Sequence, residues 1–293
     1  MTAALMGFDG RIIERFSASY ARSANQKVIT AAIEEATRKC FKGRNLTGIG
    51  VAASGMVNAT TGQIISMILT PGLDGLEVRS MLSDQFNTTV LVDHHPRVLA
   101  LGDRWFGLAR HGQDFASVYT GEALGFGIVR QGQIVSGVDG AGGESGHTIV
   151  QLDGTQCECG NRGCWETVAT LAWLRSEAQQ LSLPDASLIT SAQLVECANN
   201  NDSGARALLD RYARNLATGI ANNEHVLASG TYIMHGDVCG GGDVMLKAIE
   251  DWVTRLSPKR GNPPKVLFAE SPDDMSLLGG GGLVLSQAFS TSA

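Results

Sequence analysis

The sequence predicts an α/β protein with two domains. Strand-like and helix-like patterns alternate in both halves of the chain, which is typical of layered α/β folds. At 293 residues the chain is long enough for two domains that each bury a core. Three cysteines within eight positions add a metal-binding loop to this fold. We place the first domain at residues 1–112 and the second at residues 113–293, and we expect the final helix to pack back on the first domain.

The first domain opens with a hairpin. Asp9-Gly10 is a strong turn signal, and it separates two strand-like runs at residues 5–8 and 11–16. Apolar residues then recur at helical spacing from about residue 25 to residue 42, where Gly43 is a natural stop. The remaining expected elements are a buried strand over 48–52, a loop over 54–62, a helix over 76–86, a strand over 89–92 and a helix over 97–110.

The second domain starts with strands and continues mainly with helices. Strand patterns at residues 115–119, 126–129 and 133–135 have Gly-rich connections, which favour meandering hairpins. The expected helices beyond this sheet span 165–181, 191–198, 205–227 and 244–256, with short strands over 232–234 and 265–268. The chain ends in a glycine run over 279–282 followed by an apolar helix.

The composition excludes several classes of function. The 23 Lys and Arg against 29 Asp and Glu leave a formal net charge of −6, so we expect no direct DNA binding by this chain. No apolar run reaches the roughly 18 residues of a membrane span, and the first residues carry no secretion signal. Clustered cysteines indicate metal binding in a reducing compartment rather than a disulfide framework, and we expect a cytoplasmic protein.

The cysteine cluster is the most informative segment of the chain. Nine residues separate His147 from Cys157, which is followed closely by Cys159 and Cys164. Three thiolates and one imidazole satisfy the tetrahedral preference of Zn²⁺, and the turn over residues 160–163 folds the last cysteine back towards the others. Because four protein ligands leave no open position, we expect a structural zinc that performs no chemistry. The alternative is three buried free thiols beside a core histidine.

The residues around this cluster resemble the signature of the ROK family, which comprises repressors, open reading frames and sugar kinases. One matching stretch covers residues 142–147 and 157–167, with the cysteine spacing at its centre. A second covers residues 90–95 and 101–110. The likeness extends in order from about residue 4 to residue 288, so it includes almost the whole chain.

The resemblance implies a two-domain, actin-like sugar-kinase fold of the ribonuclease H-like type, with the ligand in the cleft between the domains. It also implies that Glu144, His147 and Glu166 occupy positions that bind sugar hydroxyls in relatives. Carboxylates and imidazoles suit that task because both exchange hydrogen bonds with vicinal hydroxyls, and a zinc loop would hold them rigid. The alternatives are a solvated loop carboxylate for Glu144 and, for Glu166, an acid favoured by the dipole at the start of a helix.

The positions that a ROK kinase uses for phosphoryl transfer depart from the family pattern. His95 stands at the position of the carboxylate base, and a neutral imidazole does not supply the fixed negative charge needed beside Mg²⁺. The second phosphate loop aligns with Gly121-Glu122-Ala123, where the carboxylate would repel a phosphate. Asp237 adds another negative charge after His235-Gly236 on the nucleotide side, and the strand bearing the first phosphate loop is absent. We therefore expect neither ATP nor Mg²⁺ to bind, and we assign no catalytic residue.

These departures favour a sugar-sensing domain of a ROK transcriptional regulator, with a small-molecule sugar as its effector and no kinase activity. His94 supports this hypothesis, because sugar-responsive repressors of the family often carry His there, and we include it among the sugar-binding residues. The helix-turn-helix of such a repressor would lie upstream, so we expect a sensor domain without its DNA-binding part, either because the chain is truncated or because its start is wrongly assigned. The alternatives are an ATP-dependent, glucokinase-like sugar kinase with His95 as an atypical base, and a degenerate paralogue that acts through protein contacts. Resemblance also implies a homodimer or a larger assembly.

Overall fold

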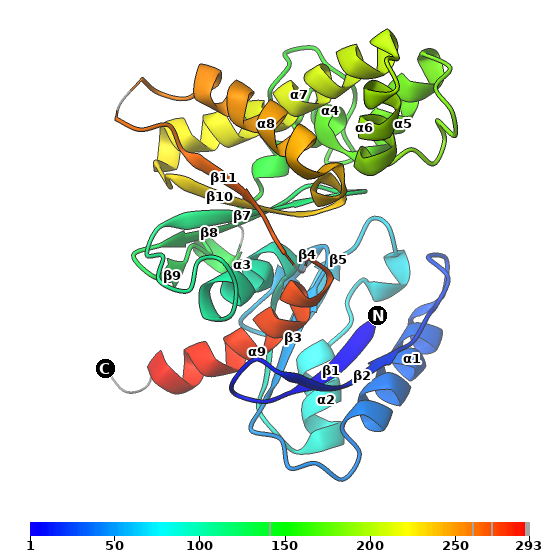
Figure 1. The fold of residues 1–293 in the computed structure, drawn as a ribbon. Coiled ribbons are helices and arrows are strands. Elements are labelled where there is room, and N and C mark those ends of the chain that lie inside the picture. The colour runs from blue at the N-terminus through cyan, green and yellow to red at the C-terminus, as the bar shows by residue number, and fades with distance from the viewer. Residues whose placement is uncertain (141, 260, 271, 291–293) are drawn as a thin grey trace. The chain divides into compact units, whose positions relative to one another are not determined.

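The computed structural model describes residues 1–140, 142–259, 261–270 and 272–290, and it contains two compact units. The first comprises Met1–His111, Ile134–Gly142 and Asp273–Ala293, and the second comprises Gly112–Gln133 and Gly143–Pro272. The chain therefore passes four times between the units, as its colours in Figure 1 allow the reader to follow. The division into domains at residues 112 and 113 remains a prediction. The compact units differ from it in that residues 134–142 and the C-terminal helix belong to the first unit.

Short sheets and helices build the first unit. The expected hairpin consists of β1 (Thr2–Met6) and β2 (Ile12–Ser17), which pair antiparallel around the turn at Asp9-Gly10. β3 (Ile49–Ala53) pairs in parallel with β6 (Val90–His94), and β4 (Met56–Asn58) pairs antiparallel with β5 (Gln63–Ser66). The sequence had indicated only a loop where β4 lies. The helices are α1 (Gln26–Cys40), α2 (Val78–Phe86), α3 (His95–Trp105) and α9 (Pro272–Ser290).

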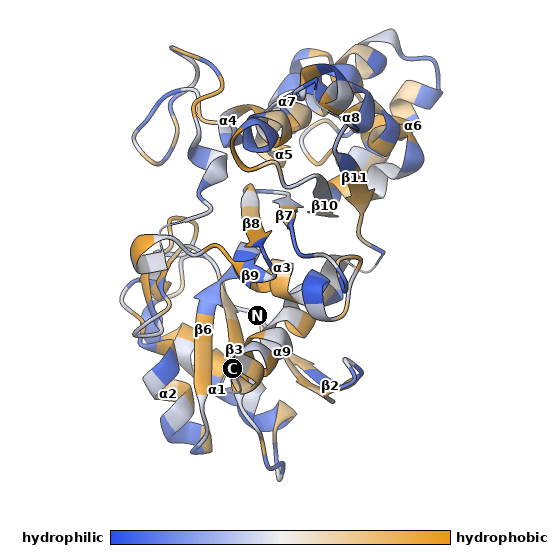
Figure 2. Ribbon diagram, turned by 90° about the vertical axis from the view of Figure 1, so that its left-hand side faces the viewer, coloured by the Kyte–Doolittle hydropathy of each residue, from blue (hydrophilic) through white to orange (hydrophobic). Residues whose placement is uncertain are grey.

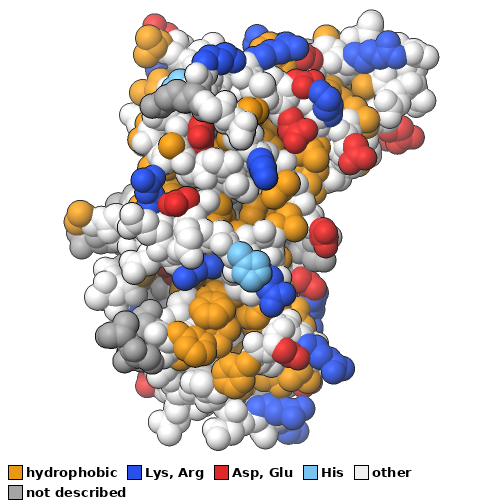
Figure 3. Space-filling view, turned by 60° about the vertical axis from the view of Figure 1, so that its left-hand side comes forward, with side chains coloured by type: hydrophobic (Ala, Val, Ile, Leu, Met, Phe, Trp, Pro, Cys, Tyr) orange, Lys and Arg blue, Asp and Glu red, His pale blue; other side chains and the backbone are white. Residues whose placement is uncertain are grey.

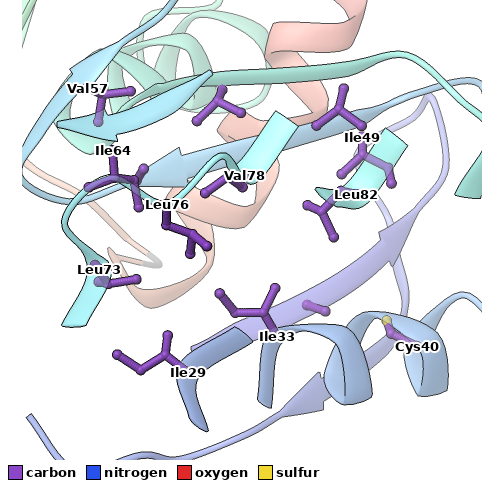
Figure 4. Packing of buried hydrophobic residues seen from close by; sticks show 14 of the residues in the cluster. Ile29, Ile33, Cys40, Ile49, Val57, Ile64, Leu73, Leu76, Val78 and Leu82 are labelled. Carbon is purple, nitrogen blue, oxygen red and sulfur yellow. The ribbon is translucent and has the colours of Figure 1, made fainter. Parts of the chain in front are cut away.

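The core of the first unit lies between α1 and the strands. Asn25 begins α1 by accepting a hydrogen bond from the backbone N–H of Val28, which satisfies a donor at the helix start. Ile29 and Ile33 then point from α1 towards Ile64 and the other apolar side chains of the cluster drawn in Figure 4. Complete burial of one such side chain stabilises the fold by about 1.5–3 kcal/mol, so this cluster holds the sheets and helices together.

The parallel pair places polar residues at one end of a buried strand. β3 and β6 run side by side in the register Ile49 to Val90 through Ala53 to His94. Figure 2 shows β6 as apolar along most of its length and polar at its carboxyl end. Helix α3 begins directly after this end, at His95. Ligands of open parallel sheets bind at the carboxyl ends of strands, which makes this corner a candidate site.

The glycine run at residues 279–282 lies inside α9 rather than before it, which corrects the expectation from the sequence. A Cβ on Gly279 would meet the carbonyl oxygen of Val98 at 1.9 Å, and one on Gly280 would approach that of Gly50 to 2.8 Å. Glycine therefore allows the backbone of α9 to approach α3 and β3 closely. This packing outweighs the poor intrinsic helix propensity of glycine.

A five-stranded sheet in the order β11-β10-β7-β8-β9 organises the second unit. β10 (Thr231–Gly236) pairs in parallel with β7 (Phe115–Thr120) and β11 (Lys265–Phe268), whereas β8 (Gly125–Arg130) pairs antiparallel with β7, and β9 (Gln133–Ile134) ends the sheet. The helices are α4 (Glu166–Ala169), α5 (Leu171–Gln180), α6 (Ser191–Asn199), α7 (Ser203–Leu227) and α8 (Gly242–Leu256). The single helix expected over 165–181 is divided because Thr170 adopts an extended conformation.

The surface carries charges of both signs. On the face shown in Figure 3, acidic and basic side chains are interspersed rather than gathered by sign. Such a face lacks the continuous basic area that would attract a phosphate backbone. Within the described residues, no helix combines the length and apolar character that crossing a bilayer requires.

Candidate functional site

Three cysteines and one histidine converge in the second unit. His147 ends a short 3-10 helix (Ser145–His147), Cys157 and Cys159 lie in the following loop, and Cys164 immediately precedes the turn into α4. One ligand atom from each of these four residues lies within 4.8 Å of the others. The Cys159 and Cys164 sulfurs are 3.6 Å apart, and Nδ1 of His147 is also 3.6 Å from Cys157 Sγ. The structure thus brings together all four residues that the spacing predicts.

Backbone hydrogen bonds and glycines form the loop that carries the thiols. The N–H of Cys157 donates to the carbonyl of Asn161 at 2.8 Å, which closes a tight turn. Gly160 (φ +93°) and Gly163 (φ +70°) adopt left-handed conformations that suit glycine. A Cβ on Gly163 would lie 1.7 Å from the carbonyl oxygen of Gln151, so a side chain cannot fit there. The sequence spacing therefore determines this geometry locally.

The spacings fit a tetrahedral metal site. With bonds of about 2.0–2.3 Å, adjacent ligand atoms around Zn²⁺ lie about 3.3–3.8 Å apart. The His147–Cys157 and Cys159–Cys164 separations of 3.6 Å fall in this range, and all four ligand atoms lie within 4.8 Å of one another. Burial raises the pKa of the Cys157 and Cys164 thiols, whereas a backbone hydrogen bond involving Asn161 lowers the pKa of exposed Cys159. A bound cation would stabilise the thiolate form of all three. The cluster can hold a metal, and its donors are consistent with zinc.

Glu166 lies directly against this cluster. Its Oε1 atom accepts a hydrogen bond from Cys157 Sγ at 3.0 Å and lies 3.2 Å from Nδ1 of His147. Glu144 precedes the same 3-10 helix and is exposed, and the neighbouring Ser145 hydroxyl donates to Asn223 Oδ1 at 3.0 Å. The three sugar-binding residues predicted in this unit therefore belong to the metal-binding loop and the residues that flank it.

The fourth predicted sugar-binding residue, His94, lies in the first unit. It occupies the position before α3, and its backbone N–H donates to its neighbour Asp93 at 2.7 Å. Burial, followed by the positive charges of Arg97 and His95, lowers the pKa of His94 to about 3. His94 is therefore neutral at physiological pH, so its ring can both donate and accept hydrogen bonds.

His95, which the sequence predicts to occupy the position of the kinase base, begins α3. Its Nε2 atom lies 2.8 Å from the hydroxyl oxygen of Ser276 in α9. This nitrogen is therefore already engaged, either as acceptor or as donor, with a side chain from the far end of the sequence. Proton abstraction by Nε2 would require that hydrogen bond to break.

The two carboxylates that the sequence predicts on the nucleotide side both accept hydrogen bonds from side chains or backbone of the second unit. Glu122 accepts a hydrogen bond from Arg175 at 2.7 Å, and Asp237 accepts from the backbone N–H and the hydroxyl of Ser191 at 3.0 and 2.6 Å. A Cβ on Gly236 would meet the Thr120 carbonyl oxygen at 2.0 Å. This glycine serves the close approach of β7 and β10, which is a structural reason for its presence.

Two residues, one at the end of β6 and one in the first turn of α3, were not predicted from the sequence as part of a site. Asp93 and Arg97 form an ion pair in which Nη2 and Oδ1 are 2.6 Å apart, and the Arg97 side chain is only 1% exposed. The available signal was an opposite-charge pair at spacing i, i+4. The burial of Arg97 could not be predicted from the sequence, because its carbonyl partners, Gly140 and Gly142, lie more than forty residues away in the chain.

Comparison with known proteins returns both kinases and repressors. The family model described as the ROK family matches residues 1–287. A glucokinase of Halalkalibacterium halodurans is 28% identical over 296 residues, which cover 95% of this chain and 89% of that protein. An N-acetylglucosamine repressor of Escherichia coli is 30% identical over 250 residues, which cover 82% of this chain and 61% of the repressor. The chain thus spans less than two thirds of the repressor's length.

The fold itself is also shared with solved structures. A ROK family transcriptional regulator, described as a homolog of the E. coli MLC protein, superposes with a TM-score of 0.83 at 21% identity. The match covers 99% of this chain and 78% of that regulator. At this identity the likeness establishes the α/β fold and leaves the activity open.

Proposed function

The chain belongs to the ROK family, and on that premise we propose that it is the sugar-sensing domain of a transcriptional regulator without kinase activity. The observation that carries the proposal is the contrast between two groups of residues. Three of the residues expected on the sugar side, Glu144, His147 and Glu166, belong to the Cys3His cluster or lie beside it in space or sequence, whereas the expected base position carries His95. Because both regulators and kinases occur among the relatives, the choice between these two functions depends on the residues of the site.

On the sugar side, His147 can serve two roles. Its Nδ1 atom faces the thiol cluster, at 3.6 Å from Cys157 Sγ, so Nε2 remains for a sugar hydroxyl. Glu166 lies against the same imidazole, and Glu144 precedes it by three positions. We propose that these three residues bind the hydroxyls of a sugar effector, and we keep His94 of the first unit as a further proposed sugar-binding residue. Neighbouring hydroxyls are suited to alternating carboxylate and imidazole partners.

We propose zinc as the metal, with a structural role. His147, Cys157, Cys159 and Cys164 would hold it, and their number leaves no open coordination position for substrate or water. The zinc would supply positive charge that stabilises buried thiolates. The loop so braced would fix the backbone of residues 144–147 and the ring of His147.

On the phosphate side, three features oppose phosphoryl transfer. The imidazole of His95 supplies no negative charge to Mg²⁺, and its Nε2 is engaged by Ser276. Glu122 and Asp237 place carboxylates where a kinase would accommodate phosphates, and their partners Arg175 and Ser191 hold them in place. Arg175 offsets the charge of Glu122, whereas Asp237 has only neutral donors from Ser191, so the negative charge of Asp237 opposes nucleotide binding. These contacts support an effector-binding domain rather than an enzyme.

The second candidate is an ATP-dependent sugar kinase. It is favoured by the glucokinase relative, which this chain matches over 89% of its length, against 61% for the repressor. In that case His95 would act as an unusual base after release from Ser276.

A coupled ATPase assay with a panel of hexoses and amino sugars separates the two functions. A kinase would turn over at roughly 1–100 s⁻¹, whereas the sensor is expected to stay below about 0.1 s⁻¹. A thermal-shift measurement with the same panel detects the effector, since a sugar at 100 times its Kd stabilises the folded protein by about 2.7 kcal/mol. Sugar-dependent ATP turnover above about 0.1 s⁻¹ would refute the proposal. The expected homodimer or larger assembly is tested by light scattering of the same sample.

A further inference from the structure

Arg97 is a charged residue with an unusual environment. It lies in the first turn of α3, and its side chain is 1% exposed, whereas the carboxylate of its partner Asp93 is 14% exposed. The guanidinium Nε donates to Asp93 Oδ1 at 2.7 Å, and Nη1 donates to the carbonyls of Gly140 and Gly142 at 2.8 and 3.1 Å. One side chain thereby joins the end of β6, the start of α3 and the segment Ile134–Gly142.

Stability alone does not account for such a group. Removing a guanidinium and a carboxylate from water costs several kcal/mol per ion, and an apolar pair of similar volume often serves the fold as well. The planar guanidinium offers something else, because its donors have fixed directions and can hold two carbonyls and a carboxylate at once. The contacts of Arg97 use this property.

The two carbonyls are next to the predicted sugar-binding loop. Residues 134–142 belong to the first unit and Gly143 begins a segment of the second, so the chain leaves the first unit directly after Gly142. Glu144 follows two residues later and His147 five residues later. Gly142 is held further by its N–H, which donates to the carbonyl of Ser136 at 2.8 Å. These bonds define where the backbone enters the loop.

The carboxylate of the same ion pair contacts the other predicted sugar residue. Asp93 Oδ1 accepts the backbone N–H of His94 as well as the hydrogen bonds from Arg97. The His94 ring also experiences the positive charge of Arg97, which contributes to the lowering of its pKa. A single buried pair therefore contacts His94 and the segment that leads to Glu144.

We infer that Asp93 and Arg97 form a positioning pair, which holds His94 at the end of β6 and fixes the backbone carbonyls that lead into the Glu144 loop. The inference rests on the proposed sugar-binding function and goes beyond it by assigning a role to two residues that touch no ligand. Their buried hydrogen bonds link two segments that are about forty residues apart in sequence.

The test uses the full chain with the substitutions Asp93→Asn and Arg97→Met combined. The double variant removes both charges together, which is expected to keep the fold, and an asparagine can still accept the N–H of His94. Hydrogen exchange is measured at the amides of Ser145 and His147, beside melting temperature, metal content and sugar Kd by calorimetry. We expect faster exchange at both amides and a Kd raised roughly 10-fold, with unchanged metal content and melting temperature.

A second variant and a control complete the experiment. Arg97→Lys keeps the positive charge but loses the planar set of guanidinium donors. It is used if the double variant fails to fold, and we again expect faster exchange at Ser145 and His147 and a raised sugar Kd. Arg130→Lys is the matched control, because Arg130 is exposed and its ion pair with Asp114 spans 3.7 Å. Wild-type exchange and wild-type Kd in the Arg97 variants would overturn the inference. If the wild type binds no sugar of the panel, the proposed function fails, and exchange at Ser145 and His147 alone decides the positioning role.

Discussion

The Nε2 atom of His95 lies 2.8 Å from the Oγ atom of Ser276, so the imidazole that is expected at the kinase-base position is hydrogen-bonded to a residue of α9. The two residues are 181 positions apart, and the contact exists because α9 packs beside α3. His95 therefore has a structural partner, and its Nε2 would have to leave Ser276 before it could act as a base.

Restoring a carboxylate at the base position should not create a kinase. We expect His95→Asp to stay below about 0.1 s⁻¹ in hexose-dependent ATP turnover, against roughly 1–100 s⁻¹ for ordinary kinases, because Glu122 and Asp237 remain. His95→Asn, of the same size without the charge, is the control. Turnover near 1 s⁻¹ in the Asp variant alone would mean that the base was the only missing part.

The metal should be bound and should stabilise the fold. We expect about one zinc per chain by atomic absorption in the wild type and close to none in Cys164→Ser, since three ligands hold zinc far less tightly than four. Loss of the metal is expected to lower stability by at least about 2 kcal/mol, or roughly 4–8 °C in the melting temperature of a domain of this size. Cys197→Ser, at an isolated half-buried thiol, should keep both properties. Equal zinc content in both variants would contradict the assignment.

Sugar affinity should depend on Glu166. Replacing its carboxylate by an amide in Glu166→Gln is expected to raise the sugar Kd about 10- to 100-fold, because hydrogen bonds to charged groups contribute about 1.5–3 kcal/mol. Metal content is measured in parallel, since Glu166 Oε1 lies 3.2 Å from His147 Nδ1. Glu158→Gln, an exposed carboxylate in the same loop, serves as control and should bind like the wild type. A similar loss in both variants would point to loop damage instead.

The free energy of unfolding should decrease as the pH falls, because His94 is held neutral in the folded protein. Its pKa in the folded protein is about 3, below the ordinary value of 6.5, so the unfolded chain binds more protons between these two pH values. The stability that neutral His94 provides is thus complete above about pH 6.5 and declines towards pH 3, by up to about 1.4 kcal/mol per pH unit. Urea unfolding at pH 7, 5.5 and 4.5 should show a shallower decline in His94→Asn. The exposed control His111→Asn should follow the wild type; equal slopes for all three would exclude this effect.

A glycine in the last helix should resist replacement. Ala has the higher helix propensity by about 1 kcal/mol, yet Gly279→Ala should lower the free energy of unfolding, because its Cβ would lie 1.9 Å from the Val98 carbonyl oxygen. Gly240→Ala is the control, since a Cβ there meets only Ala192, at 3.6 Å or beyond. Chemical denaturation of both variants measures the difference. A stabilised Gly279→Ala protein would contradict the close packing of α9.

Local patterns in the sequence were sufficient for most elements. The Asp9-Gly10 hairpin and α1 both follow from turn chemistry and periodicity within a few residues. Where a neighbour far along the chain decides, the patterns failed. The glycines at 279–282 disfavour a helix by propensity, and the close approach to Val98 and Gly50 explains the place of the first two, Gly279 and Gly280, inside α9.

The same division applies to the site. The Cys3His cluster was determined by the sequence itself, because His147 and the three cysteines lie within eighteen residues and a glycine turn closes the loop. The engagement of His95 by Ser276 and the burial of Arg97 against Gly140 and Gly142 were decided only by the tertiary structure. Spacing constrains ligands that one loop can bring together, whereas hydrogen bonds between distant segments exist only after packing has placed their donors and acceptors side by side.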